Sequence, residues 1–214
     1  QAAESLVDAL ADLHAVEPES VDLGDLGRPS GFVSRQIEGW SRRWHRAATR
    51  PVQDMETASA ALSSAIPEPQ RVAVLHNDYK LDNTMIDDHG DLVAVFDWDM
   101  ATLGDPLVDV GTLLAYWAQP DDPTYLVFGA NAVAIGEVMP KDEVRRWYAD
   151  RSGLDLSDVQ FYEALALFRI AVIIEQIYAR YVAGQTSDQR FAAFEPLAPM
   201  LASEAVRLLS ERGF

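Results

Sequence analysis

The chain has 214 residues, no cysteine and a formal net charge of −17. This length suits one large domain with a sizeable core, and the missing cysteines exclude a disulfide framework and a zinc–thiolate site. The acidic balance argues against a nucleic-acid partner. No apolar run approaches the roughly 20 residues that cross a bilayer, and no signal peptide is visible. We therefore predict a cytoplasmic protein without a membrane partner.

The first third of the chain is predicted to be helical. Leu6, Leu10 and Leu13 recur at helical spacing, and Glu17-Pro18 ends that helix. A loop rich in Pro and Gly follows, and further helices are predicted over residues 34–48 and 54–65. Ile37, Trp40 and Trp44 share one face of the first of these, which is more typical of core packing than of a substrate platform.

Short strands are predicted in the middle of the chain. The apolar run Val72–Leu75 is typical of a buried strand, and it stops at His76. Residues 84–86 and 92–96 flank Asp87-Asp88-His89-Gly90, a turn that predicts a β-hairpin because Gly90 can adopt a positive φ. Asp78 and Asn83 then lie on a loop between two strands, and Asp97 follows the next strand. The three side chains can therefore meet.

A helix is predicted to begin at Pro106, with Asp105 as its N-cap. Leu107, Val110 and Leu114 form its apolar stripe. Asp109 lies between them and is expected to face inward, where a carboxylate needs hydrogen-bonding partners. The N–H groups of the loop that contains Asp78 would provide these partners.

The rest of the chain is predicted to be helical over residues 124–137, 140–149, 157–182 and 188–211. Ser157-Asp158-Val159-Gln160 has the form of a capping box and opens the long helix. Its predicted core side includes Phe161, Leu165, Phe168, Val172 and Ile173. Glu175 interrupts that side, either as a carboxylate of a substrate pocket or, more simply, as an outward-facing or ion-paired residue. The predicted fold class is α+β, a mostly helical lobe with a small β-hairpin that carries the catalytic loop.

The polar residues around the hairpin have the parts needed for magnesium-assisted phosphoryl transfer. Asp78 can accept a proton from an attacking hydroxyl. The amide oxygen of Asn83 and the carboxylate of Asp97 are hard ligands that suit Mg²⁺, which binds a few protein oxygens together with substrate phosphates. Lys80 could neutralise charge on the transferred phosphoryl group.

Simpler roles are open for several residues near the hairpin. Lys80 could be solvated rather than catalytic, and His76 is expected to be a hydrogen-bonded structural histidine. Asp99 could be a third carboxylate facing the metal or a member of a structural ion pair. The net charge of −17 could steer cationic substrates toward the protein, but the acidic residues are scattered, which favours a role in solubility.

The pattern His76-x-Asp78-x-x-x-x-Asn83 has the spacing of a kinase catalytic loop, and Asp97 stands where kinases have the metal-binding Asp of D-F-G. Between Val72 and Trp117 the chain resembles the aminoglycoside phosphotransferase and choline kinase superfamily. It is most similar to the bacterial branch related to the kinase domains fused to acyl-CoA dehydrogenases.

The resemblance implies a protein-kinase-like fold, ATP as phosphoryl donor and the hydroxyl of a small molecule as acceptor. It implies that Asp78 is the catalytic base, that Asn83 and Asp97 bind Mg²⁺, that His76 braces the loop, and that Asp109 holds the loop backbone. The acceptor class stays open among aminoglycosides, choline-like amino alcohols, sugars and hydroxyacyl compounds, and so does the oligomeric state.

Two features of ATP-binding lobes are not found in the chain. In kinase-like enzymes a Gly-rich loop and a strand lysine of the small lobe hold ATP. Gly24, Gly27 and Gly31 follow no predicted strand, and Lys80 and Lys141 are the only lysines. We therefore predict that residues 1–214 form the C-terminal lobe of a phosphotransferase, without the N-terminal ATP lobe, and that the isolated fragment is inactive.

Two other functions compete with this prediction. Asp97 and Asp99 could be the nucleophile and the acid/base of a haloacid dehalogenase-type phosphatase, but that fold needs alternating β and α units, which the pattern lacks. Alternatively, the chain could be a catalytically silent kinase-like domain used for interaction.

Overall fold

A computed structural model describes residues 1–125, 127–128, 139–211 and 213. The α-helices are α1 (Ala2–Ala15), α2 (Phe32–Ala47), α3 (Gln53–Ser64), α4 (Leu107–Tyr116), α6 (Lys141–Ser152), α7 (Val159–Val182) and α8 (Leu197–Glu211). The strands are β1 (Ala73–Leu75), β2 (Thr84–Ile86), β3 (Leu92–Val95) and β4 (Thr102–Gly104). Short 3-10 helices are η1 (Pro18–Val21), η2 (Leu81–Asn83), η3 (Trp98–Met100) and η4 (Gln189–Phe194). None of the helices in this described part of the chain is both long and apolar enough to cross a bilayer.

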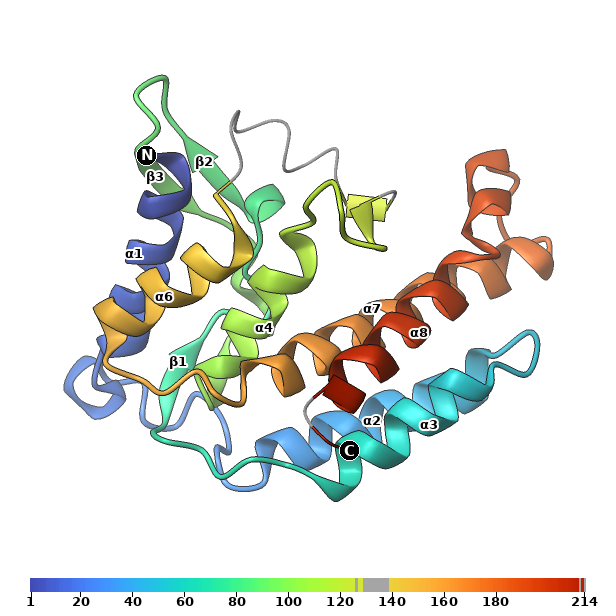
Figure 1. The fold of residues 1–214 in the computed structure, drawn as a ribbon, viewed down its shortest axis with the longest axis horizontal. Coiled ribbons are helices and arrows are strands. Elements are labelled where there is room, and N and C mark those ends of the chain that lie inside the picture. Colours follow the sequence, from blue (N-terminus) through green and yellow to red (C-terminus); the bar gives the residue numbers. More distant parts are fainter. Residues whose placement is uncertain (126, 129–138, 212, 214) are drawn as a thin grey trace.

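The helices form two groups on either side of α4 (Figure 1). α7 and α8 run alongside each other, with α2 and α3 packed beneath them. α1 and α6 pack together on the other side, near the hairpin of β2 and β3. The amphipathic pattern explains the position of α2, whose Ile37, Trp40 and Trp44 are buried as predicted.

Both sheets are two-stranded and antiparallel. β2 pairs with β3, with Thr84 opposite Val95, which confirms the predicted hairpin. β1 pairs with β4, with Val74 opposite Leu103. The segment of β4 was not predicted as a strand, because it is short and its partner lies far away in the sequence. These antiparallel pairs are not the alternating β and α units that a haloacid dehalogenase-type phosphatase would need.

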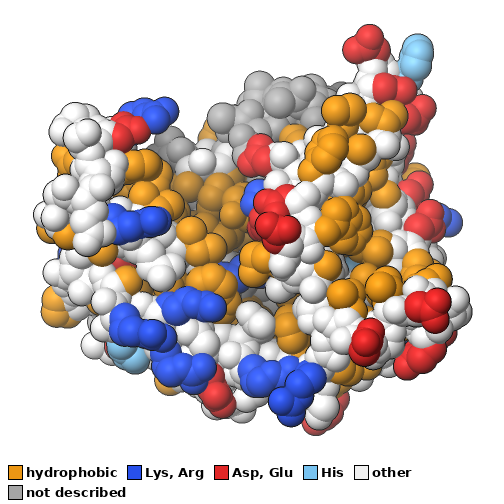
Figure 2. Space-filling view, turned by 180° about the vertical axis from the view of Figure 1, so that it is seen from behind, with side chains coloured by type: hydrophobic (Ala, Val, Ile, Leu, Met, Phe, Trp, Pro, Cys, Tyr) orange, Lys and Arg blue, Asp and Glu red, His pale blue; other side chains and the backbone are white. Residues whose placement is uncertain are grey.

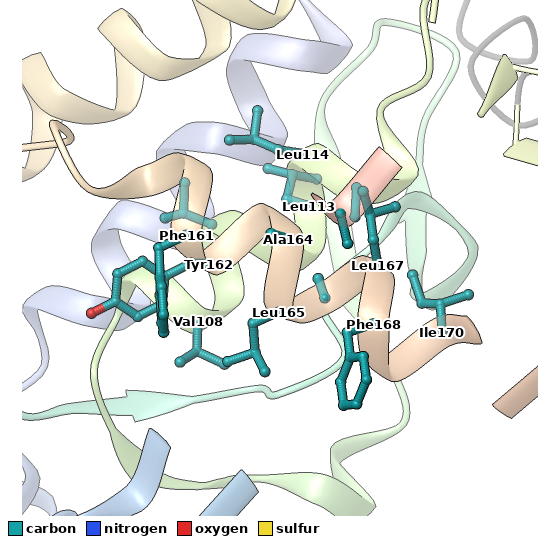
Figure 3. Close-up of a cluster of buried hydrophobic side chains, with 14 of the residues drawn as sticks. Val108, Leu113, Leu114, Phe161, Tyr162, Ala164, Leu165, Leu167, Phe168 and Ile170 are labelled. Carbon is teal, nitrogen blue, oxygen red and sulfur yellow. The ribbon is translucent and has the colours of Figure 1, made fainter. Parts of the chain in front are cut away.

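α4 and α7 form the centre of the core. Leu113, Leu114, Phe161 and Phe168 belong to a cluster of buried apolar side chains between them (Figure 3). The two helices approach closely at Gly111, where an added Cβ would lie 2.3 Å from the backbone carbon of Tyr162.

Asp105 links the start of α4 to α7. Its Oδ1 accepts a hydrogen bond from the N–H of Leu107 at 2.9 Å, and its Oδ2 accepts one from the hydroxyl of Tyr162 at 2.5 Å. Burial raises the pKa of the Asp105 carboxyl, and the hydrogen bond from Tyr162 opposes that shift. These contacts fix the position of α4, and with it the position of Asp109.

The structure differs from the predicted helices in two places. The last predicted helix, 188–211, is divided into η4 and α8, and Pro196 lies between them. Ile173 was expected on the core side of α7 but is 36% exposed. Of the alternatives left open for Glu175, the structure shows the ion-paired one, because Glu175 is fully buried and pairs with Arg50. Most of the helix predicted over 124–137 lies outside the described residues.

The close approach at Gly111 predicts that Gly111→Ala is destabilising. The new methyl group would have to push apart the backbones of α4 and α7, so the free energy of unfolding should fall by about 1–3 kcal/mol. Gly39→Ala is the matched control, because its Cβ would be 3.9 Å from the nearest atom, a flexible arginine nitrogen. Inside a helix this change should stabilise by up to about 1 kcal/mol. Urea denaturation of both variants measures the difference, and equal effects would contradict it.

Candidate active site

The loop between β1 and β2 is held by the carboxylate of Asp109. Its Oδ2 accepts a hydrogen bond from the N–H of His76 and its Oδ1 one from the N–H of Asn77, both at 2.7 Å. His14 of α1 lies 3.3 Å from Oδ2 through its Nε2, and all of these groups are buried. A buried carboxylate with several donors is stable, so it fixes the loop backbone at the end of β1.

His76 connects this loop to the end of β3. The N–H of Asp78 donates to Nδ1 of His76 at 3.2 Å, and Nε2 of His76 lies 2.8 Å from the carbonyl oxygen of Phe96. A carbonyl oxygen can only accept and a backbone N–H can only donate, so Nε2 is the donor of this pair of contacts and Nδ1 is the acceptor. His76 is fully buried. It braces the backbone on both sides of the site.

Asn77 has a left-handed backbone conformation, with φ of 63°. Asparagine tolerates this region better than most residues because its short side chain can form local hydrogen bonds. Its side-chain Nδ2 donates to the carbonyl oxygen of Met100 at 3.2 Å. Its carbonyl and side-chain oxygens accept hydrogen bonds from Arg169 at 2.9 and 3.1 Å.

Arg169 of α7 is a residue of the site that the sequence analysis missed. Its guanidinium is buried, bonds to Asn77 and lies 3.8 Å from Oδ1 of Asp78. Burial lowers the pKa of the Arg169 guanidinium, and the charge of Asp78 opposes that shift. A lone cation within the apolar run from Leu167 to Ile174 is a signal that could have identified it.

Asp78, Lys80 and Asn83 form one hydrogen-bonded cluster. Nζ of Lys80 lies 2.5 Å from Oδ2 of Asp78, and Nδ2 of Asn83 donates to the same oxygen at 3.0 Å. Nδ2 of Asn83 also donates to the backbone oxygen of Asp78 at 2.9 Å. The Asp78 carboxylate is 21% exposed. It is therefore held in place and still accessible to a small molecule.

Lys80 is ordered by its surroundings rather than freely solvated. Its side chain is 18% exposed, and Nζ lies 5.2 Å from the centre of the Tyr116 ring. Burial raises the pKa of the Tyr116 hydroxyl to about 12, and the nearby charge of Asp78 adds to that shift. The hydroxyl therefore stays neutral, and the ring is a cation–π partner of the ammonium group.

The hairpin brings the backbones of Asn83 and Asp97 together. The N–H of Phe96 donates to the carbonyl oxygen of Asn83 at 2.8 Å, so Asp97 follows directly after this contact. Asp97 is exposed and left-handed, with φ of 62°. Its carboxylate and the Asn83 amide oxygen make no hydrogen bond with the described residues. An amide oxygen and a carboxylate oxygen without protein partners are a donor set that fits Mg²⁺.

The segment after Asp97 is exposed. Asp99 lies in η3 and makes no ion pair with a described residue. Trp98 packs its ring 4.7 Å from the ring of His76, centre to centre, and donates from Nε1 to the carbonyl oxygen of Val95 at 3.0 Å. Trp98 therefore fixes this turn, while the Asp99 side chain faces solvent.

The chain folds into a helical lobe with an antiparallel hairpin and a loop that bears Asp78 and Asn83. These features define the class of protein as a kinase-like phosphotransferase lobe. The model of the phosphotransferase enzyme family (APH) matches residues 1–148. The chain belongs to that family.

Curated relatives are similar to the chain over nearly its whole length. The chain is 28% identical over 208 residues to mouse acyl-CoA dehydrogenase family member 10, covering 96% of this chain and 20% of the relative. It is 29% identical over 189 residues to rat acyl-CoA dehydrogenase family member 11, covering 86% of this chain and 24% of the relative. The chain thus spans about a fifth to a quarter of these relatives.

Solved structures support the same fold. A crystal structure from Ralstonia eutropha, of a protein provisionally named an aminoglycoside phosphotransferase, superposes with a TM-score of 0.84 at 28% identity. The match covers 98% of this chain and 65% of the Ralstonia chain. A choline/ethanolamine kinase family protein from Mesorhizobium loti, 16% identical, gives a TM-score of 0.59 over 98% of this chain and 65% of its own. This second likeness shows the fold alone.

The burial of Arg169 predicts that Arg169→Gln is destabilising. The substitution leaves the buried carbonyl of Asn77 without its charged donor, so the free energy of unfolding should fall by about 1–3 kcal/mol. Arg190→Gln is the control, because Arg190 is 87% exposed and its one ion-pair partner among the described residues is Asp188. That change should leave the stability nearly unchanged, because an exposed ion pair contributes little. Denaturant unfolding compares the two, and a loss at position 169 no greater than the control would refute the assigned contacts.

Proposed function

We propose that this chain is the catalytic and acceptor-binding lobe of an ATP- and Mg²⁺-dependent phosphotransferase that acts on a hydroxyl of a small molecule. One observation carries the proposal. The structure brings Asp78, Lys80 and Asn83 into a single cluster at the end of the hairpin from which Asp97 emerges. The family and the R. eutropha neighbour support phosphoryl transfer in general.

Asp78 is the proposed general base. Its carboxylate accepts the hydroxyl proton while the hydroxyl oxygen attacks the γ-phosphorus of ATP. The bond from that phosphorus to the bridging oxygen then breaks, and ADP leaves with the electron pair. Asn83 and Arg169 hold the carboxylate from two sides, so its orientation is set before substrate binds.

Asn83 and Asp97 are the proposed magnesium ligands. When bound, Mg²⁺ would neutralise charge on the phosphates of ATP. Lys80 is a proposed second cation. In the structure it pairs with Asp78. A bound phosphoryl group would compete for its ammonium, which would free the carboxylate to receive a proton.

ATP needs more groups than the described residues supply. The chain has no Gly-rich loop after a strand and no lysine before position 80. We therefore propose that residues 1–214 act as the C-terminal lobe and that an N-terminal lobe outside this chain completes the ATP site. The experiments on turnover thus use the longer protein in which these residues occur.

Asp78→Asn should abolish phosphoryl transfer by the longer protein. Loss of a general base lowers turnover by about 10²–10⁴-fold, because the amide cannot accept the proton. ATP binding should be unchanged, which calorimetry can test.

Asp88→Asn, in the exposed hairpin turn, is the control and should be as active as the unaltered protein. Full turnover by Asp78→Asn would refute the assignment. Failure of the unaltered protein to turn over any hydroxyl compound would favour an interaction domain.

Asp97→Asn should raise the Mg²⁺ concentration needed for half-maximal turnover by about 10-fold or more. An amide is a neutral and weaker ligand than a carboxylate for this hard cation. Magnesium titrations of Asp97→Asn and of Asp99→Asn separate a ligand from its exposed neighbour. An equal shift in both variants would contradict the assignment of Asp97 alone.

A further inference from the structure

An open hollow of about 750 Å³ lies between α2 and α7, away from the catalytic loop. The side chains that line it are basic or apolar, apart from one glutamine. They are Arg43, Arg46 and Ala47 from α2, and Ile173, Gln176, Ile177 and Arg180 from α7. None of them has a role in the proposed phosphoryl transfer.

The arginines of this hollow are not neutralised by the protein. Arg43, Arg46 and Arg180 form no ion pair with any carboxylate in the described residues, whereas most other basic side chains there do. The chain has 34 acidic and 17 basic residues, so unpaired arginines are not expected to cluster by chance. A cluster of free guanidinium groups is a binding site for an external anion, above all phosphate.

Local contacts hold these guanidinium groups in position. Nε of Arg46 donates to the carbonyl oxygen of Arg42 at 3.2 Å, and Nε of Arg180 donates to that of Gln176 at 3.3 Å. The guanidinium of Arg43 lies 4.3 Å above the ring of Trp40. The remaining N–H groups of Arg46 and Arg180 have no partner among the described residues and can bind a ligand.

The floor of the hollow is apolar. Ile173 is 36% exposed there, although the pattern of α7 placed it in the core. Ile177 and Ala47 lie beside it. On the face shown in Figure 2, Lys and Arg side chains gather along the lower edge of the molecule. A ligand that fits this lining has an anionic group attached to an apolar body.

A second, smaller pocket lies between the same two helices, on the side of the hollow that faces the catalytic loop. It is lined by Gln36, Trp40, Asn77 and Arg169, one or two turns nearer to Asp78. Arg169 and Arg180 are 11 residues apart on α7, which corresponds to about 16 Å along the helix at 1.5 Å per residue. An acceptor of about this length with its hydroxyl at Asp78 would place an anion between Arg43 and Arg180.

We infer that this hollow is the anion subsite of the phosphoryl acceptor, an inference that rests on the proposed function. The acceptor is an elongated molecule with a hydroxyl at one end, an apolar middle and a phosphate group at the other end. A cationic acceptor is disfavoured there, because the arginines would repel it.

Calorimetric binding to the chain tests this subsite without requiring turnover. The probes are octyl phosphate, octyltrimethylammonium and inorganic phosphate. The test variant combines Arg43→Gln, Arg46→Gln and Arg180→Gln, all exposed positions where the fold should be kept. Arg42→Gln is the matched control, because Arg42 lies on the same helix but pairs with Glu38.

Octyl phosphate should bind to the unaltered chain more tightly than either other probe, and the triple variant should weaken it by about tenfold or more. Arg42→Gln and Asp78→Asn should leave the affinity for octyl phosphate within about twofold.

Unchanged binding of octyl phosphate to the triple variant, or tighter binding of the quaternary ammonium probe, would overturn the subsite. Inorganic phosphate that binds as tightly as octyl phosphate would overturn its assignment to an acceptor with an apolar body. If the unaltered longer protein turns over no hydroxyl compound although octyl phosphate binds, the proposed function is refuted and the anion site still stands.

Discussion

The site depends on the hydrogen bonds between the Asp109 carboxylate and the N–H groups of His76 and Asn77. A buried carboxylate without partners would cost several kcal/mol, so these bonds are strongly favoured once α4 is in place. They orient the loop so that the next residue, Asp78, turns away from the core. The position of α4 is fixed in turn by Asp105 and by the close contact at Gly111.

Opposite charges hold the loop from two helices. Asp109 of α4 binds the N–H of Asn77, and Arg169 of α7 binds its carbonyl oxygen. The peptide groups on either side of Asn77 are thus engaged by a buried anion and a buried cation. Neither charge has to be solvated by water, since each meets backbone dipoles of the opposite sign. This arrangement explains how a short loop with a left-handed residue can be rigid enough to orient Asp78.

Much of this site could be predicted from local sequence, because its residues lie close together on the chain. The spacing of His76, Asp78 and Asn83 and the hairpin turn indicated the cluster, and the apolar stripe of α4 indicated that Asp109 faces inward. Arg169 was missed because its partners are about ninety positions away. The same holds for β4, which pairs with β1, and for Glu175, whose burial depends on Thr49 and Arg50. Such pairings follow from tertiary packing and leave little trace in a local pattern.

The charge of the whole chain and the charge of its grooves lead to opposite conclusions about ligands. A net charge of −17 suggests attraction of cations at long range. Exposed charges are screened beyond about 8 Å at physiological ionic strength, so a ligand within the hollow of α2 and α7 responds mainly to the arginines that line it. The scattered acidic residues then serve solubility, and binding is decided by the few unpaired guanidinium groups. For a strongly acidic protein, the informative charges are therefore the basic side chains that no carboxylate neutralises.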